Sequence, residues 1–409
     1  MNYSSMESGS IGTRVGILGG GQLARMLVEA AYRLGLRPLV LAGSLRDPAA
    51  QLCPDAVLGT WDDPVVSRRF LAQVEVVAFE NEFVSCEKLK EVAGEFPESR
   101  RPRFSPLLGS IFQLQDKLRQ KEILSGLQIP SAPFLVYEPG GDLKVWVSSL
   151  IERFKGQFVL KWAQLGYDGK GIWISSGNLS TDLAAAVEFS EAALKRGVPL
   201  FAEQKIFFKR ELALIGCYSI TGEFKAYPLV ISDQKSGICR LVQGPATALG
   251  VSQELERLAT QYAQRIAETL PLHGCFALEL FETEQGELWV NELAPRVHNT
   301  GHYTLDAADT SQFENHWRAL LGIPLGETRT APAFAMLNLL GHEASTEKPK
   351  RIPLFKLPSR IHLHWYGKSE LRVGRKLGHL NGLADQPRDL PALIKTLEEC
   401  EKTWIKKRA

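Results

Sequence analysis

The sequence has no long uninterrupted run of apolar residues. Nowhere in its 409 residues does it approach the run of about 18 apolar residues that a membrane-spanning helix requires, so no transmembrane helix is expected. The first 13 residues are polar and small. Because they lack a basic start and an apolar centre, they are not a secretory signal, and we expect a frayed tail.

An excess of charge of one sign is also missing. The chain carries 48 basic and 46 acidic residues, for a net charge of +2. This near-balance gives no electrostatic basis for general binding to nucleic acid or to a membrane surface. The six cysteines are spread along the chain and include no C-x-x-C pair, so a zinc site is not expected. Cysteines spaced in this way are typical of reduced, mostly buried thiols in a cytoplasmic protein.

The composition is that of a soluble globular protein, 44% hydrophobic and 23% charged, in a chain long enough for two or three domains. Residues 14–112 alternate strand and helix patterns, which predicts a doubly wound α/β domain after a tail over 1–13. A Pro-rich stretch over 101–110 marks the end of this domain. We expect a second domain over 113–332, and a β-rich segment with a terminal helix over 333–409.

The stretch from Cys275 to Thr304 is the most informative part of the chain. Its pattern predicts two strands joined by a turn, then a loop crowded with polar side chains. If the turn is the two-residue loop Gln285-Gly286, Glu279 lies directly opposite Glu292. Carboxylates ~5 Å apart repel by roughly 3 kcal/mol at an effective dielectric near 20. A divalent cation such as Mg²⁺ would turn this repulsion into a ligand pair, and the alternative is a solvent-facing hairpin with scattered acids.

A glycine turn near the N-terminus matches a dinucleotide-binding fingerprint. Gly19, Gly21 and Ala24 follow a strand and open a helix, where glycines let the backbone approach an anion. An NAD site also needs an acidic residue about 20 residues later, at the end of the second strand. Residues 41–44 there are Leu-Ala-Gly-Ser. The pattern therefore favours a phosphate-binding turn without NAD, with a purely structural turn as the alternative.

A second glycine-rich segment, from Lys161 to Gly171, also suits phosphate. It is not a Walker A loop, because no Gly-Lys-Ser/Thr occurs in it. Asp168-Gly169 between two β-rich runs predicts a hairpin. Its glycine tip would close over a triphosphate, while Lys161 supplies a point charge.

Three further groups are weaker on their own. Residues 202–206, AEQKI, end a strand and precede Glu211, which suits an adenine edge and a ribose or an ordinary strand end. Glu80 and Glu82 follow a strand, where open α/β sheets bind ligands, although simple loop acids fit equally well.

The third group is a basic turn. Lys368, Arg375 and Lys376 lie close together in the sequence HWYGKSELRVGRK. Three cations in one place suit a phosphate monoester, and the alternative is a solvated basic turn.

Together these motifs resemble the N5-carboxyaminoimidazole ribonucleotide synthetases, a family of ATP-grasp ligases in purine biosynthesis. The resemblance runs from about residue 14 to 382 and rests on GGGQLARM, FENE, LQDKLRQK, LKWAQLGYDGKG, AEQKI, NELAPRVHNTGHYT and GRKLGHLN. It implies an α/β ATP-grasp fold with a preATP-grasp domain, a small lid over about 135–205 and a C-terminal β-rich segment. The sequence departs from the family at Leu165, where glycine is usual, and at Lys117, which is often Arg.

The resemblance also implies site residues. ATP would be bound by Lys117, Lys161, Gly166, Tyr167, Asp168, Gly169, Lys170, Gly171, Glu203, Gln204, Lys205, Ile206, Glu211, Asn291 and Glu292. Mg²⁺, or Mn²⁺ in its place, would be held by Glu279 and Glu292. The reacting groups would meet the catalytic residues Tyr167, Asp168, Arg296, His298 and Asn299. The ribonucleotide would be bound by Gln22, Glu80, Lys368, Arg375 and Lys376.

By resemblance, the activity is ATP- and bicarbonate-dependent carboxylation of 5-aminoimidazole ribonucleotide through carboxyphosphate, carried out by a cytoplasmic homodimer. A sibling ATP-grasp ligase, such as formate-dependent glycinamide ribonucleotide transformylase, shares the carboxylates, but the cations at 368–376 and the HNTGH run argue against it. An NAD(P) oxidoreductase lacks its strand-end acid here. A non-catalytic nucleotide sensor would lose the metal acids, and both are present.

Overall fold

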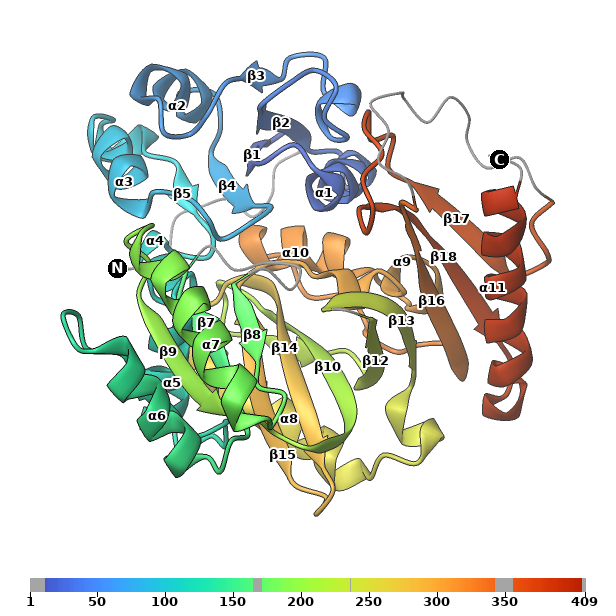
Figure 1. Cartoon of the computed structure of the whole chain (residues 1–409). Coiled ribbons are helices and arrows are strands. Elements are labelled where there is room, and N and C mark those ends of the chain that lie inside the picture. Colours follow the sequence, from blue (N-terminus) through green and yellow to red (C-terminus); the bar gives the residue numbers. More distant parts are fainter. Residues whose placement is uncertain (1–11, 165–170, 236, 343–355, 407–409) are drawn as a thin grey trace.

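The computed structural model describes residues 12–164, 171–235, 237–342 and 356–406, and its strands form three sheets (Figure 1). Residues 1–11 of the predicted tail lie outside these ranges. Thr13, however, is buried, and its carbonyl accepts a hydrogen bond of 3.0 Å from the amide of Arg37. The last residue of the predicted tail is therefore packed against the chain, and the first strand begins at Arg14.

The N-terminal sheet is parallel, with strand order β3-β2-β1-β4-β5. Its elements are β1 (Arg14–Leu18), α1 (Gln22–Arg33), β2 (Arg37–Ala42), β3 (Val57–Leu58), α2 (Pro64–Leu71), β4 (Val76–Phe79), α3 (Cys86–Gly94) and β5 (Arg103–Phe104). Val15 and Ile17 pack toward α1, while Leu18 packs in the cluster that contains α2 and α3. Helices thus cover both faces, and the predicted doubly wound α/β fold is confirmed.

The largest sheet has nine antiparallel strands in the order β15-β14-β10-β12-β13-β16-β18-β17, with β11 paired to β10. The strands are β10 (Phe208–Tyr218), β11 (Phe224–Ala226), β12 (Val230–Lys235), β13 (Ile238–Gly244), β14 (Gly274–Thr283), β15 (Leu288–Ala294), β16 (Ala333–Leu340), β17 (Ile361–Trp365) and β18 (Lys376–Ala384). Because β16 pairs with β13, the sheet crosses the predicted domain boundary at 333 without interruption.

Amphipathic helices close this sheet. Helix α8 (Gln253–Thr269) is capped by Ser252, whose side chain accepts a hydrogen bond from the amide of Leu255. Its small and branched residues, Ala259 among them, pack on β10, β14 and β15. The terminal helix α11 (Leu390–Lys406) covers β16 and β18 at the right of Figure 1.

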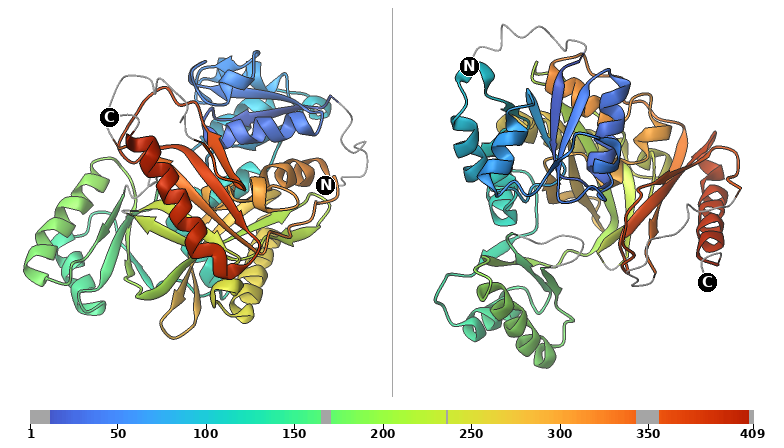
Figure 2. Two further views of the ribbon diagram at one scale, coloured as in Figure 1. Left: turned by 90° about the vertical axis from the view of Figure 1, so that its right-hand side faces the viewer. Right: turned by 90° about the horizontal axis from the view of Figure 1, so that it is seen from above.

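A third, four-stranded antiparallel sheet has the order β6-β9-β7-β8. It comprises β6 (Phe134–Val136), α6 (Leu143–Arg153), β7 (Phe158–Trp162), β8 (Ile172–Ile174), α7 (Leu179–Leu194) and β9 (Leu200–Gln204). Both views in Figure 2 show this part projecting from the rest of the molecule. It occupies the stretch in which the lid is predicted.

The N-terminal domain is fixed to the large sheet by α10 (Gln312–Leu321), which lies against α1. The indole Nε1 of Trp317 donates a 2.9 Å hydrogen bond to the carbonyl of Leu27, and Trp317 is fully buried. The connection between the domains runs through α4 (Leu108–Leu114) and α5 (Lys117–Gly126), so the boundary predicted between 112 and 113 falls inside α4.

The remaining short elements are α9 (Thr304–Ala307) and the 3₁₀ turns η1 (Ala50–Leu52), η2 (Glu98–Arg100), η3 (Ala246–Leu249), η4 (Asn299–Gly301) and η5 (Pro387–Asp389). All six cysteines are buried free thiols, as predicted. Among the helices of the described residues, none combines the length and the apolar character needed to cross a bilayer.

Candidate active site

The hairpin β14–β15 places Glu279 directly opposite Glu292, as predicted. The predicted two-residue loop is wrong, however. The amide of Thr283 donates to the carbonyl of Glu287 at 2.9 Å, so the loop has three residues, 284–286. Gly286 takes φ +80°, the left-handed conformation that glycine adopts readily and that a three-residue hairpin loop needs at one position.

A β-bulge compensates for the longer loop. The ladder pairs Glu279 with Glu292 and Leu280 with Val290, so Asn291 is the extra residue on β15. Asn291 and Glu292 each contact a lysine: Lys161 Nζ donates to Asn291 Oδ1 at 3.2 Å, and Lys117 Nζ donates to Glu292 Oε2 at 2.7 Å. The bulge therefore brings two consecutive side chains to one cluster of cations, which a regular strand does not do.

The two facing carboxylates have different electrostatic surroundings. Burial and the facing charge of Glu292 raise the pKa of Glu279 to about 7, although Lys117 opposes this rise. For Glu292, burial acts to raise the pKa, but Lys117 holds it below its ordinary value. Glu292 is thus neutralised by Lys117, while Glu279 forms no ion pair with a lysine or arginine among the described residues.

The nearest histidine does not supply the missing charge. His298 Nε2 lies 3.6 Å from Glu279 Oε1. Burial, with the charges of Arg296 and Lys376, lowers the pKa of His298 well below its ordinary value, so the imidazole is neutral at physiological pH. Within the described ranges no cluster of three or more His, Cys, Asp or Glu side chains could hold a metal ion. Two carboxylates beside an amide oxygen suit Mg²⁺, which takes few protein ligands and completes its shell with water and phosphate oxygens.

A buried carboxylate, that of Glu203, is shared by two lysines. Glu203 in β9 forms ion pairs with Lys161 of β7 and with Lys121 of α5, the latter at 2.9 Å. Burial acts to raise the pKa of Glu203, but the two ammonium groups hold it below its ordinary value. Glu203 is therefore placed beside the cations rather than in the open. Sequence reasoning missed Lys121, although it lies one helical turn after Lys117, on the same face of α5.

Helix α5 is itself fixed at its first turn. The Asp116 carboxylate accepts hydrogen bonds from the amides of Leu118 and Arg119 at 2.9 and 3.2 Å, which caps the helix. Its second oxygen accepts from Gln164 Nε2 at 3.0 Å, and the amide of Lys117 donates to the carbonyl of Ala163 at 2.7 Å. These bonds tie the start of α5 to the chain that follows β7.

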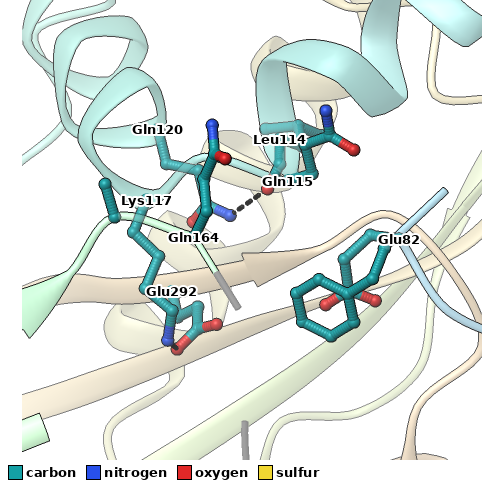
Figure 3. A pocket seen from close by; sticks show the side chains of 9 residues that line it. Glu82, Leu114, Gln115, Lys117, Gln120, Gln164 and Glu292 are labelled. Carbon is teal, nitrogen blue, oxygen red and sulfur yellow. Dashed lines mark hydrogen bonds and ion pairs between the residues drawn. The ribbon is translucent and has the colours of Figure 1, made fainter. Parts of the chain in front are cut away.

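A pocket opens beside this helix start. It is lined by Glu82, Phe83, Leu114, Gln115, Lys117, Gln120, Ala163, Gln164 and Glu292. Figure 3 shows the Lys117–Glu292 pair on one side of the pocket and Glu82 across from it. The pocket therefore has a cation and a carboxylate from the large domain on one wall and a carboxylate from the N-terminal domain on another.

Arg296 connects these two domains. Its Nε donates to Glu82 Oε2 at 2.7 Å, and a terminal nitrogen donates to Glu82 Oε1 at 3.4 Å. Burial acts to lower the pKa of Arg296, but Glu82, with Glu80 and Glu292, raises it. The guanidinium is thus a fixed positive charge at the junction of the N-terminal domain and the hairpin.

The glycine turn at Gly19 and Gly21 was predicted to bind a phosphate, but in the structure it holds the side chain of Glu80. The amide of Gly21 donates to Glu80 Oε2 at 2.6 Å. A Cβ added to Gly21 would meet a Glu80 oxygen at 2.1 Å, and one on Gly19 would meet the other oxygen at 2.5 Å. The glycines make room for a carboxylate of the chain itself, which takes the place of an external anion at the N-terminus of α1. Gln22, the first residue of α1, is half-buried beside this turn.

Glu80 also lies near the predicted phosphate-binding cations. Burial raises its pKa, while the amides of Gly21 and Ala24 and the charges of Lys368 and Arg296 oppose that rise. Glu80 and Lys368, which are far apart in the sequence and both expected at the ribonucleotide, are therefore brought together.

The other two cations of the basic turn diverge. Lys376 begins β18, and its charge opposes the raised pKa of Glu279 and lowers that of His298. Arg375 instead contacts Glu370, with 3.4 Å between its Nη1 and Glu370 Oε2. Lys368 and Lys376 thus face the acidic centre, while Arg375 is paired with a neighbour on its own turn.

The loop after Glu292 supplies an unusual polar group. The side chain of Asn299 is buried, yet neither its oxygen nor its nitrogen has a hydrogen-bond partner among the described residues. An unsatisfied buried amide is costly, and a ligand or water that bonds to it removes the cost. Next to it, His298 Nδ1 lies 2.9 Å from Thr300 Oγ1, and this contact fixes the orientation of the His298 imidazole ring.

The residues predicted to bind the adenine and the ribose of ATP lie at the end of β9, in the connection to β10 and in β10 itself. Gln204 ends β9 and is exposed, and Lys205 and Ile206 form the connection. Lys205 Nζ donates to the carbonyl of Ser175 at 3.4 Å, next to β8. Glu211 lies in β10, where burial and then the charge of Asp233 raise its pKa to about 7.

Most of the predicted lid loop lies outside the described residues. Gly166, Tyr167, Asp168, Gly169 and Lys170 lie outside the described residues. Gly171 is described, and beside it Lys161 of β7 pairs with Ile172 of β8 in an antiparallel ladder. The predicted hairpin strands are therefore confirmed.

Comparisons with known proteins agree with this geometry. Three family models match: the ribonucleotide synthetase preATP-grasp domain over residues 12–103, the ATP-grasp domain over 122–313, and the phosphoribosylaminoimidazole carboxylase C-terminal domain over 335–392. The N5-carboxyaminoimidazole ribonucleotide synthase of Mycobacterium leprae is 36% identical over 96% of this chain and 89% of its own length. That of Synechococcus elongatus is 38% identical over 90% of this chain and 88% of its own.

A solved structure is similar over almost the whole molecule. It is N5-carboxyaminoimidazole synthase from Aspergillus clavatus in complex with ADP and 5-aminoimidazole ribonucleotide, 30% identical to this chain. The match has a TM-score of 0.81 and covers 96% of this chain and 99% of the other. From its sequence, its domains and its fold, the chain belongs to the N5-carboxyaminoimidazole ribonucleotide synthase family of ATP-grasp ligases.

Proposed function

We propose that this protein uses ATP and bicarbonate to carboxylate 5-aminoimidazole ribonucleotide, forming N5-carboxyaminoimidazole ribonucleotide in purine biosynthesis. The observation that carries the proposal is the juxtaposition at Glu292. There, the Glu292 carboxylate, paired with Lys117, faces the buried carboxylate of Glu279, on which Lys376 from the C-terminal segment also acts. The Aspergillus relative binds ADP and the ribonucleotide, which supports the same pair of ligands here.

The chemistry needs activation of bicarbonate, because hydroxide is a poor leaving group. Transfer of the γ-phosphoryl group of ATP to a bicarbonate oxygen gives ADP and carboxyphosphate. The exocyclic amine of the ribonucleotide then attacks the carboxyl carbon, or the CO₂ that carboxyphosphate releases, and inorganic phosphate and a proton leave. Catalysis of such transfers depends mainly on positioning and on neutralising phosphate charge.

The phosphate end of ATP is assigned to the cations around the hairpin. Lys117 and Lys161 hold the triphosphate, and Glu279 and Glu292, with Asn291 beside them, would hold Mg²⁺ or Mn²⁺. The metal, when bound, would neutralise phosphate oxygens and orient them for in-line transfer. The fit rests on two facing carboxylates, of which Glu279 has its pKa raised to about 7 by burial and by the charge of Glu292. Gln204, Lys205, Ile206 and Glu211 are assigned to the base and ribose.

The acceptor end is assigned to the loop after Glu292. Arg296 is the fixed cation for bicarbonate and for the oxyanions that develop on it, because its charge is secured by Glu82. His298 and Asn299 meet the imidazole ring or the carboxyphosphate. Lys368, Lys376 and, after it leaves Glu370, Arg375 bind the 5′-phosphate.

The remaining ribonucleotide contacts are assigned to the N-terminal domain. Glu80, with Gln22, binds the ribose, since the Gly21 amide engages one Glu80 oxygen whereas Arg296 engages both oxygens of Glu82. Tyr167 and Asp168 in the lid tip remain predicted catalytic residues. A closed lid would exclude water that otherwise hydrolyses carboxyphosphate.

Two properties follow from the family alone. We propose a homodimer, which sedimentation of the purified protein tests by its mass. We propose a cytoplasmic location, with which six buried free thiols are compatible.

The test is formation of carboxylated product from ¹⁴C-bicarbonate, MgATP and 5-aminoimidazole ribonucleotide, with each omitted in turn. We expect product only when all three are present. Glu292→Gln should abolish product while circular dichroism stays native, and Glu287→Gln, in the same hairpin but at its exposed turn, should retain activity. ADP release without carboxylated product would refute the proposal, and product from formate and glycinamide ribonucleotide would establish the sibling ligase instead.

A further inference from the structure

A column of rings, buried except for the partly exposed His364, lies between the C-terminal strands and the acceptor loop. His364 of β17 is paired with His379 of β18 in the ladder, and their rings stack with centroids 4.5 Å apart at 12°. The centroid of the His302 ring lies 4.9 Å from that of His379. His379 Nδ1 forms a 2.7 Å hydrogen bond with the hydroxyl of Tyr366. Tyr366 and His379 are fully buried.

The column is anchored at one carboxylate, that of Asp306. Its Oδ2 accepts hydrogen bonds from His364 Nε2 at 2.7 Å and from Asn381 Nδ2 at 2.6 Å. The same Asn381 amide donates to the carbonyl of His302 at 3.0 Å. Asp306 thus fixes His364 directly, and through Asn381 it ties β18 to the loop that carries His298 and Asn299.

The other end of the column meets a cation. Lys368 Nζ lies over the ring of Tyr366, 5.6 Å from its centroid. An ammonium within about 6 Å of an aromatic face is attracted by the negative potential of that face. Lys368 is itself buried and lies close enough to Glu80 to influence its pKa. The ring of Tyr366 therefore forms part of the surface against which the ammonium group rests.

We propose that Tyr366, oriented by its hydrogen bond to His379, is a positioning residue that holds the Lys368 ammonium where the 5′-phosphate of the ribonucleotide binds. This inference rests on the proposed function, because it assigns Lys368 to that phosphate. Lysine has a flexible stem, and ordering it costs conformational entropy. A fixed aromatic face reduces that cost at binding, since the cation is placed before the phosphate arrives.

A purely structural role would use the same residues differently. If these side chains only packed the core, apolar rings would be favoured, because each buried polar group costs free energy unless it forms a hydrogen bond. Here the hydroxyl of Tyr366 is hydrogen-bonded to His379 and its aromatic face carries a cation, while both ring nitrogens of His302 and the Nε2 of His379 have no hydrogen-bond partner among the described residues. The two roles differ in one measurable way: only positioning makes the effect of changing Tyr366 depend on Lys368.

The experiment is a double-mutant cycle on the full-length protein, read as KM for the ribonucleotide at saturating MgATP and bicarbonate. Tyr366→Leu removes the aromatic face and should raise this KM by roughly threefold to thirtyfold, with little change in KM for ATP. Tyr366→Phe keeps the face and should recover most of that loss. In a Lys368→Ala background, Tyr366→Leu should add less than about twofold.

Trp365→Leu is the matched control. It removes an aromatic ring from the neighbouring position, which packs edge-on against Trp404 of α11. It should leave KM for the ribonucleotide unchanged. The wild-type enzyme in the same assay tests the proposed function separately, since absence of carboxylated product there refutes the function and not this inference.

The results decide between the two roles. The positioning role is overturned if Tyr366→Leu leaves KM for the ribonucleotide unchanged, or changes it equally with and without Lys368. If Tyr366→Leu does not fold, the cycle is run with Tyr366→Phe, which loses only the bond to His379. A smaller rise in KM that again disappears in the Lys368→Ala background supports the proposal, and one that persists there overturns it.

Discussion

Replacing Glu203 by glutamine should strongly destabilise the fold while changing its shape very little. The Glu203 carboxylate is the common partner of Lys121 and Lys161, which come from α5 and β7. The three side chains are 4–7% exposed. Glutamine keeps the size of the side chain but removes its charge, so two buried ammonium groups are left without their shared counter-charge.

The expected loss of unfolding free energy follows from the two lysine charges that share the one carboxylate. Removing one partner of a buried ion pair typically costs about 3–5 kcal/mol. The two lysines, both in reach of one carboxylate and so ~5 Å apart, would in addition repel each other by about 3 kcal/mol at an effective dielectric near 20. Loss of a proton from one lysine limits the total, since burial already lowers the pKa of Lys121 below its ordinary value. We therefore expect a loss of about 3–5 kcal/mol.

Urea denaturation followed by circular dichroism measures this loss of unfolding free energy. Repeating the measurement at different pH values and with ADP tests whether unpaired lysine charge is its cause. Because the folded variant would favour a neutral lysine, it would bind fewer protons than the unfolded chain, and its deficit should shrink as pH rises from 7 to 9. If Lys161 binds phosphate, ADP supplies negative charge to the same place and should stabilise Glu203→Gln more than it stabilises the wild type.

The matched control is Glu95→Gln. Glu95 forms an ion pair with Arg68 in which both side chains are nearly half exposed, so its loss should cost under about 1 kcal/mol. A Glu203→Gln deficit no larger than that of Glu95→Gln would refute the reasoning that Glu203 neutralises two buried cations.

Three further predictions concern other parts of the molecule. Glu82→Gln, which weakens the hold on Arg296, should lower kcat at least about tenfold with little change in KM for ATP; steady-state kinetics with unchanged kcat would contradict the role of this pair. Trp317→Phe loses the hydrogen bond to Leu27 and should cost about 1–3 kcal/mol of unfolding free energy, and a urea curve that superposes on the wild type would exclude that. Burial lowers the pKa of His298, His302, His316 and His379, so only the unfolded chain protonates them as pH falls below about 6.5. Stability should therefore fall by up to about 1.4 kcal/mol per pH unit for each group, and a flat profile between pH 7.5 and 5.5 would contradict this.

The sequence was sufficient for the features that depend on local periodicity. The alternation of strand and helix patterns before Pro102 predicted the parallel sheet, and the facing of Glu279 and Glu292 was predicted correctly. Glu279 and Glu292 face each other even though the hairpin differs from the prediction in two ways, because the two differences cancel. The loop is one residue longer than predicted, and the bulge at Asn291 restores the pairing. Bulges leave little trace in a hydrophobic pattern, because a single extra residue among alternating positions looks like an irregularity.

The features that the sequence did not reveal depend on contacts between distant segments. Lys121 looked like one charge in a polar helix, and only the packing of α5 against β9 pairs it with Glu203. The glycine turn predicted an external phosphate, but the group held there is the carboxylate of Glu80, which directly follows β4 and lies 59 residues after Gly21. Local pattern predicts that a turn will attract negative charge, whereas the source of that charge is decided by the tertiary fold.

The pairing of β16 with β13 has a consequence for how this protein can be divided. The C-terminal segment is not an attachable module, because its first strand completes the hydrogen bonds of Ile238–Gly244 in the catalytic half. A chain that stopped before residue 333 would present that strand as an open edge, ready to pair with another copy. Premature termination there should yield aggregates rather than a soluble enzyme that merely binds its ribonucleotide weakly. For the same reason, exchanging this segment between relatives would succeed only if β13 is exchanged with it.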